Sequence, residues 1–271
     1  MKVPLAVRAV PSLALRAWFT PPPLSDRRRA VWESSLEGTE SITLDVDGNS
    51  LKGFVHGQGP LVFLVHGWGG RAAQMGRLGK SVAALGFKVV AVDFPGHGEQ
   101  KWDRSDIFQM STALQALKEH FGHPDAVIAH SLGSMAAVYA FQDEMPGRLV
   151  LLAPMLDVSE ALATFAERAR LLPWASALLK RRIRRFCGDS WPIFAAGTDT
   201  DFGEAQVMVI HDPADPDTRF ESSAVLAAVR QDTHLVVTKS KGHNGILADD
   251  GVAGDIGRFL TGLGATRQRS A

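Results

Sequence analysis

The order of apolar and polar segments in this chain of 271 residues predicts alternating strands and helices. Residues 61–65, Leu-Val-Phe-Leu-Val, are wholly apolar, as expected of a strand buried on both faces of a sheet. Residues 72–85 carry apolar positions at helical spacing, and residues 88–92 form the next apolar strand. Further strands are expected at 126–129, 149–153, 207–210 and 235–237, with helical stretches at 107–121, 225–229 and 256–263. Alternation of this kind predicts an α/β fold, a mostly parallel sheet with helices on both faces.

Two segments depart from this alternation. Residues 41–46 and 50–56 flank the turn sequence Asp47-Gly48-Asn49, which predicts an antiparallel hairpin. Residues 155–200 interrupt the rhythm with basic and apolar positions interleaved, which indicates amphipathic helices inserted as a cap. The predicted organisation is an N-terminal arm (1–40), a core (41–154 and 201–264), a helical cap insertion (155–200) and a C-terminal tail (265–271).

A serine lies where an apolar strand gives way to a helical pattern. Residues 129–133 read Ala-His-Ser-Leu-Gly, and residues 134–141 read as a small-residue helix packed on the preceding strand. A serine on such a strand-to-helix turn has its hydroxyl exposed at the top of the sheet. Unpaired N–H groups at the helix N-terminus can stabilise negative charge beside it. Ser131 is therefore a candidate nucleophile.

Such a serine needs a base, and the base needs an acidic partner that orients it. His243, in Gly-His-Asn-Gly, follows the last predicted strand, and its flanking glycines allow the backbone to bend sharply. Residues 211–217, His-Asp-Pro-Ala-Asp-Pro-Asp, follow another strand and offer three carboxylates. We prefer Asp215, which is far enough along the turn to point back toward the strand ends. Asp212 remains the alternative.

Acyl transfer also needs N–H donors for the oxyanion of its tetrahedral intermediate. The backbone N–H of Leu132, directly after the serine, is the first candidate. The second is expected on a loop after an early strand. Residues 66–70, His-Gly-Trp-Gly-Gly, follow the apolar strand, and their glycines allow the backbone to approach a ligand closely. The N–H of Trp68 is the predicted second donor.

With these motifs in order, the chain resembles α/β-hydrolase-fold enzymes, in particular esterase- and lipase-like serine hydrolases with a cap insertion. The resemblance implies that Ser131 is the nucleophile, Asp215 the acid and His243 the base, with Trp68 and Leu132 donating through their backbones. The order of serine, aspartate and histidine along the chain matches that family. The segments that carry the resemblance are 66–70, 93–98 (Asp-Phe-Pro-Gly-His-Gly), 129–133, 211–215 and 242–243.

Two positions depart from the family pattern. The usual first glycine of the turn that carries the nucleophile is Ala129 here, and one methyl group still lets strand and helix approach closely. The usual glycine after the strand-end histidine is Asp212, which places a second carboxylate near the predicted acid Asp215.

The function predicted from these residues is hydrolysis of a carboxylic ester or thioester through an acyl-enzyme. The same apparatus can run acyl transfer, carbon–carbon bond hydrolysis or lyase chemistry, and the scaffold can also host a catalytically silent binding protein. Epoxide and haloalkane hydrolases are disfavoured, because such family members carry aspartate where Ser131 stands.

The partner expected for this chemistry is a small-molecule acyl substrate, and composition argues against other partners. Basic and acidic residues balance at 29 each, so overall charge does not favour nucleic acid. Cys187 is the only cysteine, which excludes an intramolecular disulfide and fits a cytoplasmic location. His211, Asp212 and Asp215 resemble a metal cluster, but no further ligand set accompanies them. We expect no metal and no organic cofactor, since no phosphate-binding glycine loop or dinucleotide fingerprint is present.

Two segments combine basic and apolar residues, a composition that is compatible with peripheral contact to a membrane. Residues 1–19 are rich in apolar residues but are interrupted by Arg8 and Arg16, so we expect an arm packed on the domain, with a membrane-surface anchor or a targeting segment as alternatives. Residues 168–187 contain seven basic residues and no acidic one. This run predicts a solvated helix face, with an electropositive cap that attracts acidic substrates or anionic lipid as the alternative. No feature of the sequence specifies an oligomeric state.

Overall fold

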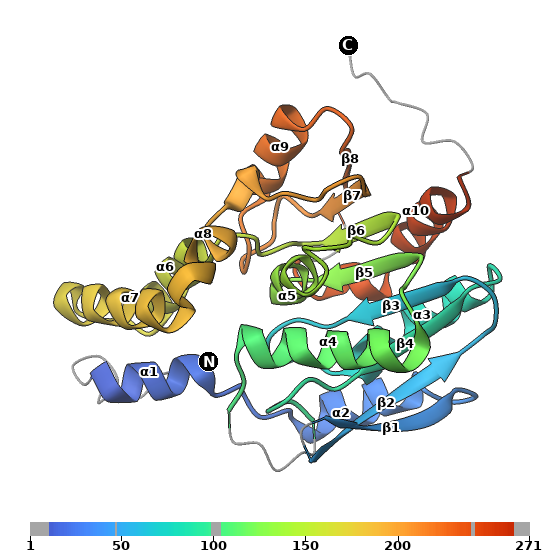
Figure 1. Ribbon diagram of the computed structural model, residues 1–271, viewed down its shortest axis with the longest axis horizontal. Coiled ribbons are helices and arrows are strands. Elements are labelled where there is room, and N and C mark those ends of the chain that lie inside the picture. The colour runs from blue at the N-terminus through green and yellow to red at the C-terminus, as the bar shows by residue number, and fades with distance from the viewer. Residues whose placement is uncertain (1–10, 47, 99–103, 240–241, 263–271) are drawn as a thin grey trace.

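The computed structural model describes residues 11–46, 48–98, 104–239 and 242–262. Its strands are β1 (Glu40–Val46), β2 (Asn49–His56), β3 (Leu61–Val65), β4 (Lys88–Val92), β5 (Ala126–His130), β6 (Arg148–Leu152), β7 (Gln206–His211) and β8 (His234–Val237). They form one eight-stranded sheet in the order β1-β2-β4-β3-β5-β6-β7-β8 (Figure 1). β1, β2 and β4 pair antiparallel, and all other neighbours are parallel. The predicted hairpin and the mostly parallel sheet are confirmed.

Every residue of β3 is apolar and buried, because helices cover both faces of the sheet. Alternate side chains of a strand point to opposite faces. In β3, Leu61, Phe63 and Val65 therefore pack into one core cluster, and Val62 and Leu64 pack into the other. Each such side chain contributes about 1.5–3 kcal/mol of burial free energy.

Each face of the sheet has its own helices (Figure 1). The helices α4 (Ile107–Phe121) and α5 (Leu132–Ala140) bury apolar side chains in the cluster that contains Phe63. The helices α3 (Gly76–Ala83) and α10 (Asp250–Thr261) cover the opposite face. The other helical elements of the core and the arm are α1 (Pro11–Phe19), α2 (Asp26–Ser34), η2 (Ala72–Met75), α9 (Phe220–Val229) and η5 (Gly245–Ala248).

A helical insertion separates β6 from β7. Its elements are α6 (Val158–Arg168), α7 (Pro173–Cys187), η3 (Gly188–Ser190), α8 (Trp191–Phe194) and η4 (Gly197–Asp199). The longest of them, α7, has a proline in its first turn. It is followed directly by Gly188, whose φ of 53° ends the helix. Its apolar stripe repeats every fourth residue and is buried: Ala175, Leu179, Ile183 and Cys187. These helices carry the cap expected from the sequence.

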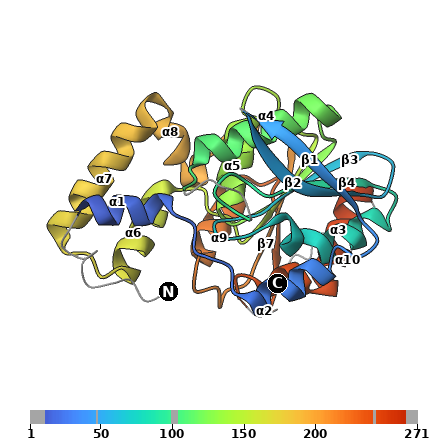
Figure 2. The same cartoon turned by 90° about the horizontal axis from the view of Figure 1, so that it is seen from below.

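The N-terminal helix α1 packs against the cap (Figure 2). The Trp18 ring meets Phe165 of α6 edge-on, with centroids 5.4 Å apart. The Phe19 ring meets Phe186 of α7 with centroids 4.9 Å apart. The described part of the arm is thus joined to the cap through aromatic pairs, and residues 1–10 of the predicted arm lie outside the described residues.

Element boundaries differ from the sequence-based expectation by a few residues. The strand before the candidate serine extends to His130, and the following helix begins at Leu132 rather than at Ser134. The expected helix at 72–85 begins as the 3-10 turn η2 and continues as α3. Asp47 in the hairpin turn and the proposed tail 265–271 lie outside the described residues. None of the described helices is long and apolar enough to cross a membrane.

Candidate active site

Ser131 lies in the sharp turn that joins β5 to α5. Its backbone adopts φ 54° and ψ −127°, a combination that costs energy in any residue with a Cβ atom. Hydrogen bonds hold the turn in place. The Ser131 N–H donates to the carbonyl of Leu152 at 3.0 Å, and the Ser131 carbonyl accepts from Met155 and Ser134. This is the geometry of a nucleophile elbow, and the Ser131 side chain remains partly exposed.

Two glycines allow the loop after β3 to pass close to this turn. A Cβ atom at Gly67 would lie 2.7 Å from Cβ of Ser131, and one at Gly133 would lie 2.5 Å from the carbonyl oxygen of His66. Neither position has room for a larger residue without movement of the neighbouring chain. Ala129, where the elbow departs from the usual glycine, is fully buried in the core cluster, which accommodates its methyl group.

The loops after β7 and β8 bring a carboxylate and an imidazole together. Oδ2 of Asp215 lies 2.7 Å from Nδ1 of His243. The side chain of Asp215 is fully buried, and that of His243 is 9% exposed. The partners of Asp215 also hold its orientation, because Oδ1 accepts from the N–H groups of Asp217 and Thr218 and Oδ2 accepts from the Thr218 hydroxyl.

These contacts keep Asp215 ionised. Burial alone would raise the pKa of its carboxyl. Hydrogen bonds from His211 and His243, the charge of His243 and the Asp217 N–H outweigh burial and hold that pKa below its ordinary value. An ionised carboxylate at this position can orient the His243 ring and stabilise an imidazolium.

Asp212 has a different environment from Asp215. Its Oδ1 accepts from the N–H of Ala214 at 2.9 Å, and its Oδ2 accepts from the N–H of Gly242 at 2.8 Å. Asp212 therefore ties the loop after β7 to the loop that carries His243. Of the two carboxylates left open by the sequence, the geometry brings Asp215 to the imidazole.

A second histidine contacts the same oxygen of the carboxylate. His211 is fully buried, with Nδ1 2.7 Å from the Ser223 hydroxyl. Its Nε2 lies 3.2 Å from Oγ1 of Thr218 and 3.4 Å from Oδ2 of Asp215. One tautomer satisfies every group: Ser223 donates to Nδ1, Nε2–H is directed at both Oγ1 of Thr218 and Oδ2 of Asp215, and the Thr218 hydroxyl donates to Asp215. Sequence reasoning considered His211 only as a metal ligand and missed this contact, although its position at the strand end before the acid was visible.

The two residues predicted as oxyanion donors line the same cavity as Ser131. Leu132 is the first residue of α5, where helix geometry leaves backbone N–H groups without intrahelical partners. Trp68 lies on the loop after β3, and its indole packs edge-on against His97, with centroids 5.2 Å apart. Both residues line the cavity that contains Ser131.

Two further histidines hold the loops around these donors. Nδ1 of His66 donates to the carbonyl of Gly67, and its Nε2 accepts from the N–H of Phe94. Nδ1 of His97 donates to the carbonyl of Pro95. Burial lowers the pKa of His66 and lowers that of His97 to about 4, so both rings are neutral at pH 7.

A cavity of about 950 Å³ opens over the turn that carries Ser131. Ser131, Leu132, Trp68 and His243 line it on the side of the sheet. Its apolar lining on the side of the arm and the cap includes Trp18, Phe19, Phe165, Ile183, Phe186 and Phe194. The contribution of the N-terminal arm to this lining was not predicted from the sequence.

Ser131 and His243 share the cavity but, in the part of the chain that the structure describes, are not hydrogen-bonded to each other. Catalytic hydrogen bonds in ligand-free enzymes are often long and tighten when substrate binds. His130 anchors the base through its backbone, because Nε2 of His130 lies 2.9 Å from the carbonyl oxygen of His243. Burial, with the nearby His243 charge, lowers the pKa of His130 to about 3, so this ring is a neutral donor.

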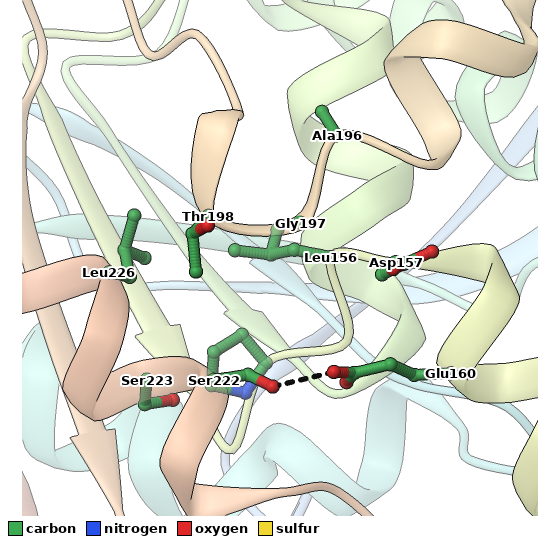
Figure 3. Close-up of a pocket in the computed structure, with 10 residues that line it drawn as sticks. Leu156, Asp157, Glu160, Ala196, Gly197, Thr198, Ser222, Ser223 and Leu226 are labelled. Atoms are coloured by element: carbon green, nitrogen blue, oxygen red, sulfur yellow. Dashed lines mark hydrogen bonds between the residues drawn. The ribbon is translucent and has the colours of Figure 1, made fainter. Parts of the chain in front are cut away.

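A smaller pocket of about 160 Å³ lies between the cap and α9 (Figure 3). It is lined by Asp157 and Glu160 on one side and by Ser222 and Ser223 on the other. The Ser222 hydroxyl donates to Glu160 at 2.7 Å. Neither Ser131 nor His243 reaches this pocket, so the larger cavity is the candidate active site.

Among the residues that the structure describes, one group of side chains has ligand atoms close enough for a metal ion. Asp215, Asp217 and His243 place such atoms within 4.8 Å of one another. Two of them bond to each other, however, and Asp217 forms an ion pair with Arg168 at 2.5 Å. This donor set is better explained by an acid–base pair and a surface ion pair than by a metal centre.

The sheet order, the turn at Ser131 and the helical insertion define an α/β-hydrolase. A family model described as serine aminopeptidase, S33 (Hydrolase_4), matches residues 58–242, more than half of the chain. The chain belongs to this family.

Individual relatives are more distant. Over 81 residues the chain is 36% identical to a pimeloyl-[acyl-carrier protein] methyl ester esterase of Chromobacterium violaceum, a match that covers 30% of this chain and 31% of that esterase. An uncharacterised protein of Mycobacterium tuberculosis is 28% identical over 240 residues, 83% of this chain and 79% of its own. An esterase structure from Pyrococcus furiosus superposes with a TM-score of 0.64 at 17% identity, covering 90% of this chain and 97% of the esterase. That structure is similar in fold.

Proposed function

We propose that this hydrolase cleaves a carboxylic ester or thioester through a catalytic triad of Ser131, His243 and Asp215. The observation that carries the proposal is the 2.7 Å contact between Asp215 and His243, on the wall of the same cavity as Ser131. A buried, ionised carboxylate on Nδ1 leaves Nε2 of His243 free to accept a proton. The strained turn at Ser131 supports the same assignment, since backbone strain of this kind is typical of nucleophiles.

The proposed reaction proceeds in two halves. Oγ of Ser131 attacks the carbonyl carbon while Nε2 of His243 removes its proton, and a tetrahedral oxyanion forms. The N–H groups of Trp68 and Leu132 donate to this oxyanion. The intermediate expels the alcohol or thiol, which receives the proton from His243. Water, deprotonated by His243, then attacks the acyl-enzyme; as the carboxylic acid leaves, His243 returns the proton to Oγ of Ser131.

The character of the cavity supports an apolar acyl group. Aromatic and aliphatic side chains of the arm and the cap face the proposed nucleophile across the cavity. Pockets of this size and lining enclose most of the surface of a small ligand. The names of the relatives point in the same direction, because the curated Chromobacterium protein and the Pyrococcus structure are both esterases.

Hydrolysis of a p-nitrophenyl ester tests the proposal directly. The wild-type protein is expected to release p-nitrophenol, and Ser131→Ala or His243→Ala is expected to lower kcat by about 10⁶-fold. Amino-acid p-nitroanilides, acyl thioesters and 1,3-diketones assayed on the same preparation separate ester hydrolysis from peptidase, thioesterase and carbon–carbon hydrolase activity. Ester hydrolysis that persists in pure, folded Ser131→Ala would refute the assignment.

A further inference from the structure

The cap helix α7 presents an exposed face of uniform charge. Its solvent-exposed side chains include Lys180, Arg181, Arg182, Arg184 and Arg185. No acidic residue lies on this helix, and the nearest along the chain are Glu167 before it and Asp189 after it. The opposite face of α7 is the buried apolar stripe, so the helix is amphipathic with its basic side outward.

These five charges are concentrated on one helix and have no carboxylate partner among the described residues. Some exposed basic side chains elsewhere do pair with carboxylates, as Arg77 does with Asp250 and Lys118 with Glu144. None of the five basic residues of α7 forms an ion pair with any described residue, although Arg184 stacks over the Trp191 ring at 5.8 Å. The chain carries no net charge. The positive charge of α7 is therefore a local concentration and not a property of the chain as a whole.

Apolar side chains are exposed at the same end of the molecule. Leu172 and Trp174, at the start of α7, are 45% and 53% exposed. Leu13 of the neighbouring α1 is 38% exposed. The helices α1 and α7 lie side by side at the edge of the molecule farthest from the sheet (Figures 1 and 2). Trp174, Arg181 and Arg185 are spaced seven and four residues apart, which places them on one stripe of α7.

We propose that this surface, formed by α7 and the exposed side of α1, docks on an anionic phospholipid bilayer. A cluster of four to eight basic residues on an amphipathic helix is attracted to acidic headgroups. Tryptophan and leucine beside such a cluster insert at the boundary between headgroups and acyl chains. The charge supplies the attraction, and Trp174, Leu172 and Leu13 supply the insertion.

A bilayer fits this surface better than an acidic protein or a nucleic acid. An acidic protein or a nucleic acid would satisfy the arginines but gives no reason for three large apolar side chains to face water beside them. A bilayer accounts for both features, because its interface offers anionic headgroups and apolar depth together. The docked face also borders the active-site cavity, since Phe186 of α7 is 43% exposed and lines that cavity.

Vesicle sedimentation tests the proposal with the full-length protein. Vesicles of phosphatidylcholine with about 30% phosphatidylserine are expected to bind the protein, and pure phosphatidylcholine vesicles are expected to bind it far less. The binding should weaken as salt rises. The triple change Lys180→Gln, Arg181→Gln and Arg185→Gln is expected to lower the partition coefficient by about 100-fold, about fivefold for each charge removed. Trp174→Ala is expected to lower it by several-fold.

A matched variant controls for the loss of three charges. Arg77→Gln, Lys80→Gln and Lys239→Gln remove the same charge at positions outside the cap and are expected to leave binding unchanged. Ser131→Ala is also expected to bind vesicles as the wild type does. A failure of the membrane proposal can therefore be distinguished from a failure of the proposed catalytic function. Circular dichroism verifies that each variant is folded. Equal binding to both vesicle types, or equal loss in the α7 and control triples, would overturn the proposal, as would binding of an acidic protein in place of vesicles.

Discussion

The two carboxylates after β7 allow a sharp test of the proposed acid. Asp215→Asn keeps the shape of the side chain but removes the charge that lies 2.7 Å from Nδ1 of His243. Two unit charges about 4 Å apart at an effective dielectric constant of about 20 interact by about 4 kcal/mol. This energy corresponds to about 10³-fold in rate, and the same change in other serine enzymes costs about 10⁴-fold. We therefore expect kcat to fall by 10³- to 10⁴-fold.

Asp212→Asn is the matched control for this change. The amide oxygen can still accept from the N–H of Gly242 or of Ala214, but not from both. The loss of one charge-assisted hydrogen bond costs about 1.5–3 kcal/mol of stability. The Asp212→Asn substitution leaves the contact between Asp215 and His243 intact, so we expect kcat to fall by about tenfold or less.

Steady-state hydrolysis of a p-nitrophenyl ester measures both variants, with circular dichroism and thermal unfolding to establish that they are folded. The reasoning would be refuted if Asp215→Asn retained kcat within about tenfold of wild type, or if Asp212→Asn lost as much activity as Asp215→Asn.

Three further outcomes follow from the structure. Ala161→Trp adds an indole to the cap wall of the cavity and should slow hydrolysis of p-nitrophenyl octanoate while sparing the acetate; equal loss on both esters would contradict an acyl site there. Gly133→Ala, with its Cβ 2.5 Å from the carbonyl of His66, should cost about 1–3 kcal/mol in urea unfolding, whereas Gly147→Ala, with 3.5 Å of room, should cost little; similar costs would argue against close packing at the turn. Because burial lowers the pKa of His97 to about 4, the unfolded chain binds a proton between about pH 6.5 and 4 that the folded chain does not, so stability falls as the pH falls. His97→Gln should reduce the pH dependence of the free energy of unfolding by up to about 1.4 kcal/mol per pH unit. An unchanged pH dependence, measured by urea unfolding, would show that His97 is not its source.

The sheet and the proposed nucleophile could be predicted because their signals are local. The apolar strand at 61–65 is buried on both faces, and its unbroken run of apolar residues already implies this. The strand and helix on either side of Ser131 lie in adjacent stretches of sequence, so the turn between them was visible. His243 was located in the same way, from its place directly after the last strand.

The choice between Asp212 and Asp215 depends on the path of a turn. The N–H of Asp215 donates to the carbonyl of Asp212 at 3.0 Å, and this turn directs Asp215 toward His243. Spacing alone could not determine that direction. The role of His211 could not be predicted for a similar reason, because its partners Ser223 and Thr218 contact it only through tertiary packing.

The wall of the cavity could not be predicted from local pattern either. Trp18 meets Phe165 across a large separation in the chain, and apolar periodicity does not reveal which amphipathic segments pair. The sequence indicated that both the arm and the cap have an apolar side. Only their packing shows that the two sides form one wall facing Ser131.

The central claim is that Ser131 is an activated nucleophile. Reaction with a fluorophosphonate probe, followed by peptide mass spectrometry, measures this most directly, because the probe phosphonylates activated serines and releases fluoride. The account predicts one adduct, on the peptide that carries Ser131, and none in folded Ser131→Ala. A folded wild-type protein that stays unlabelled, or that is labelled at another serine, would contradict it.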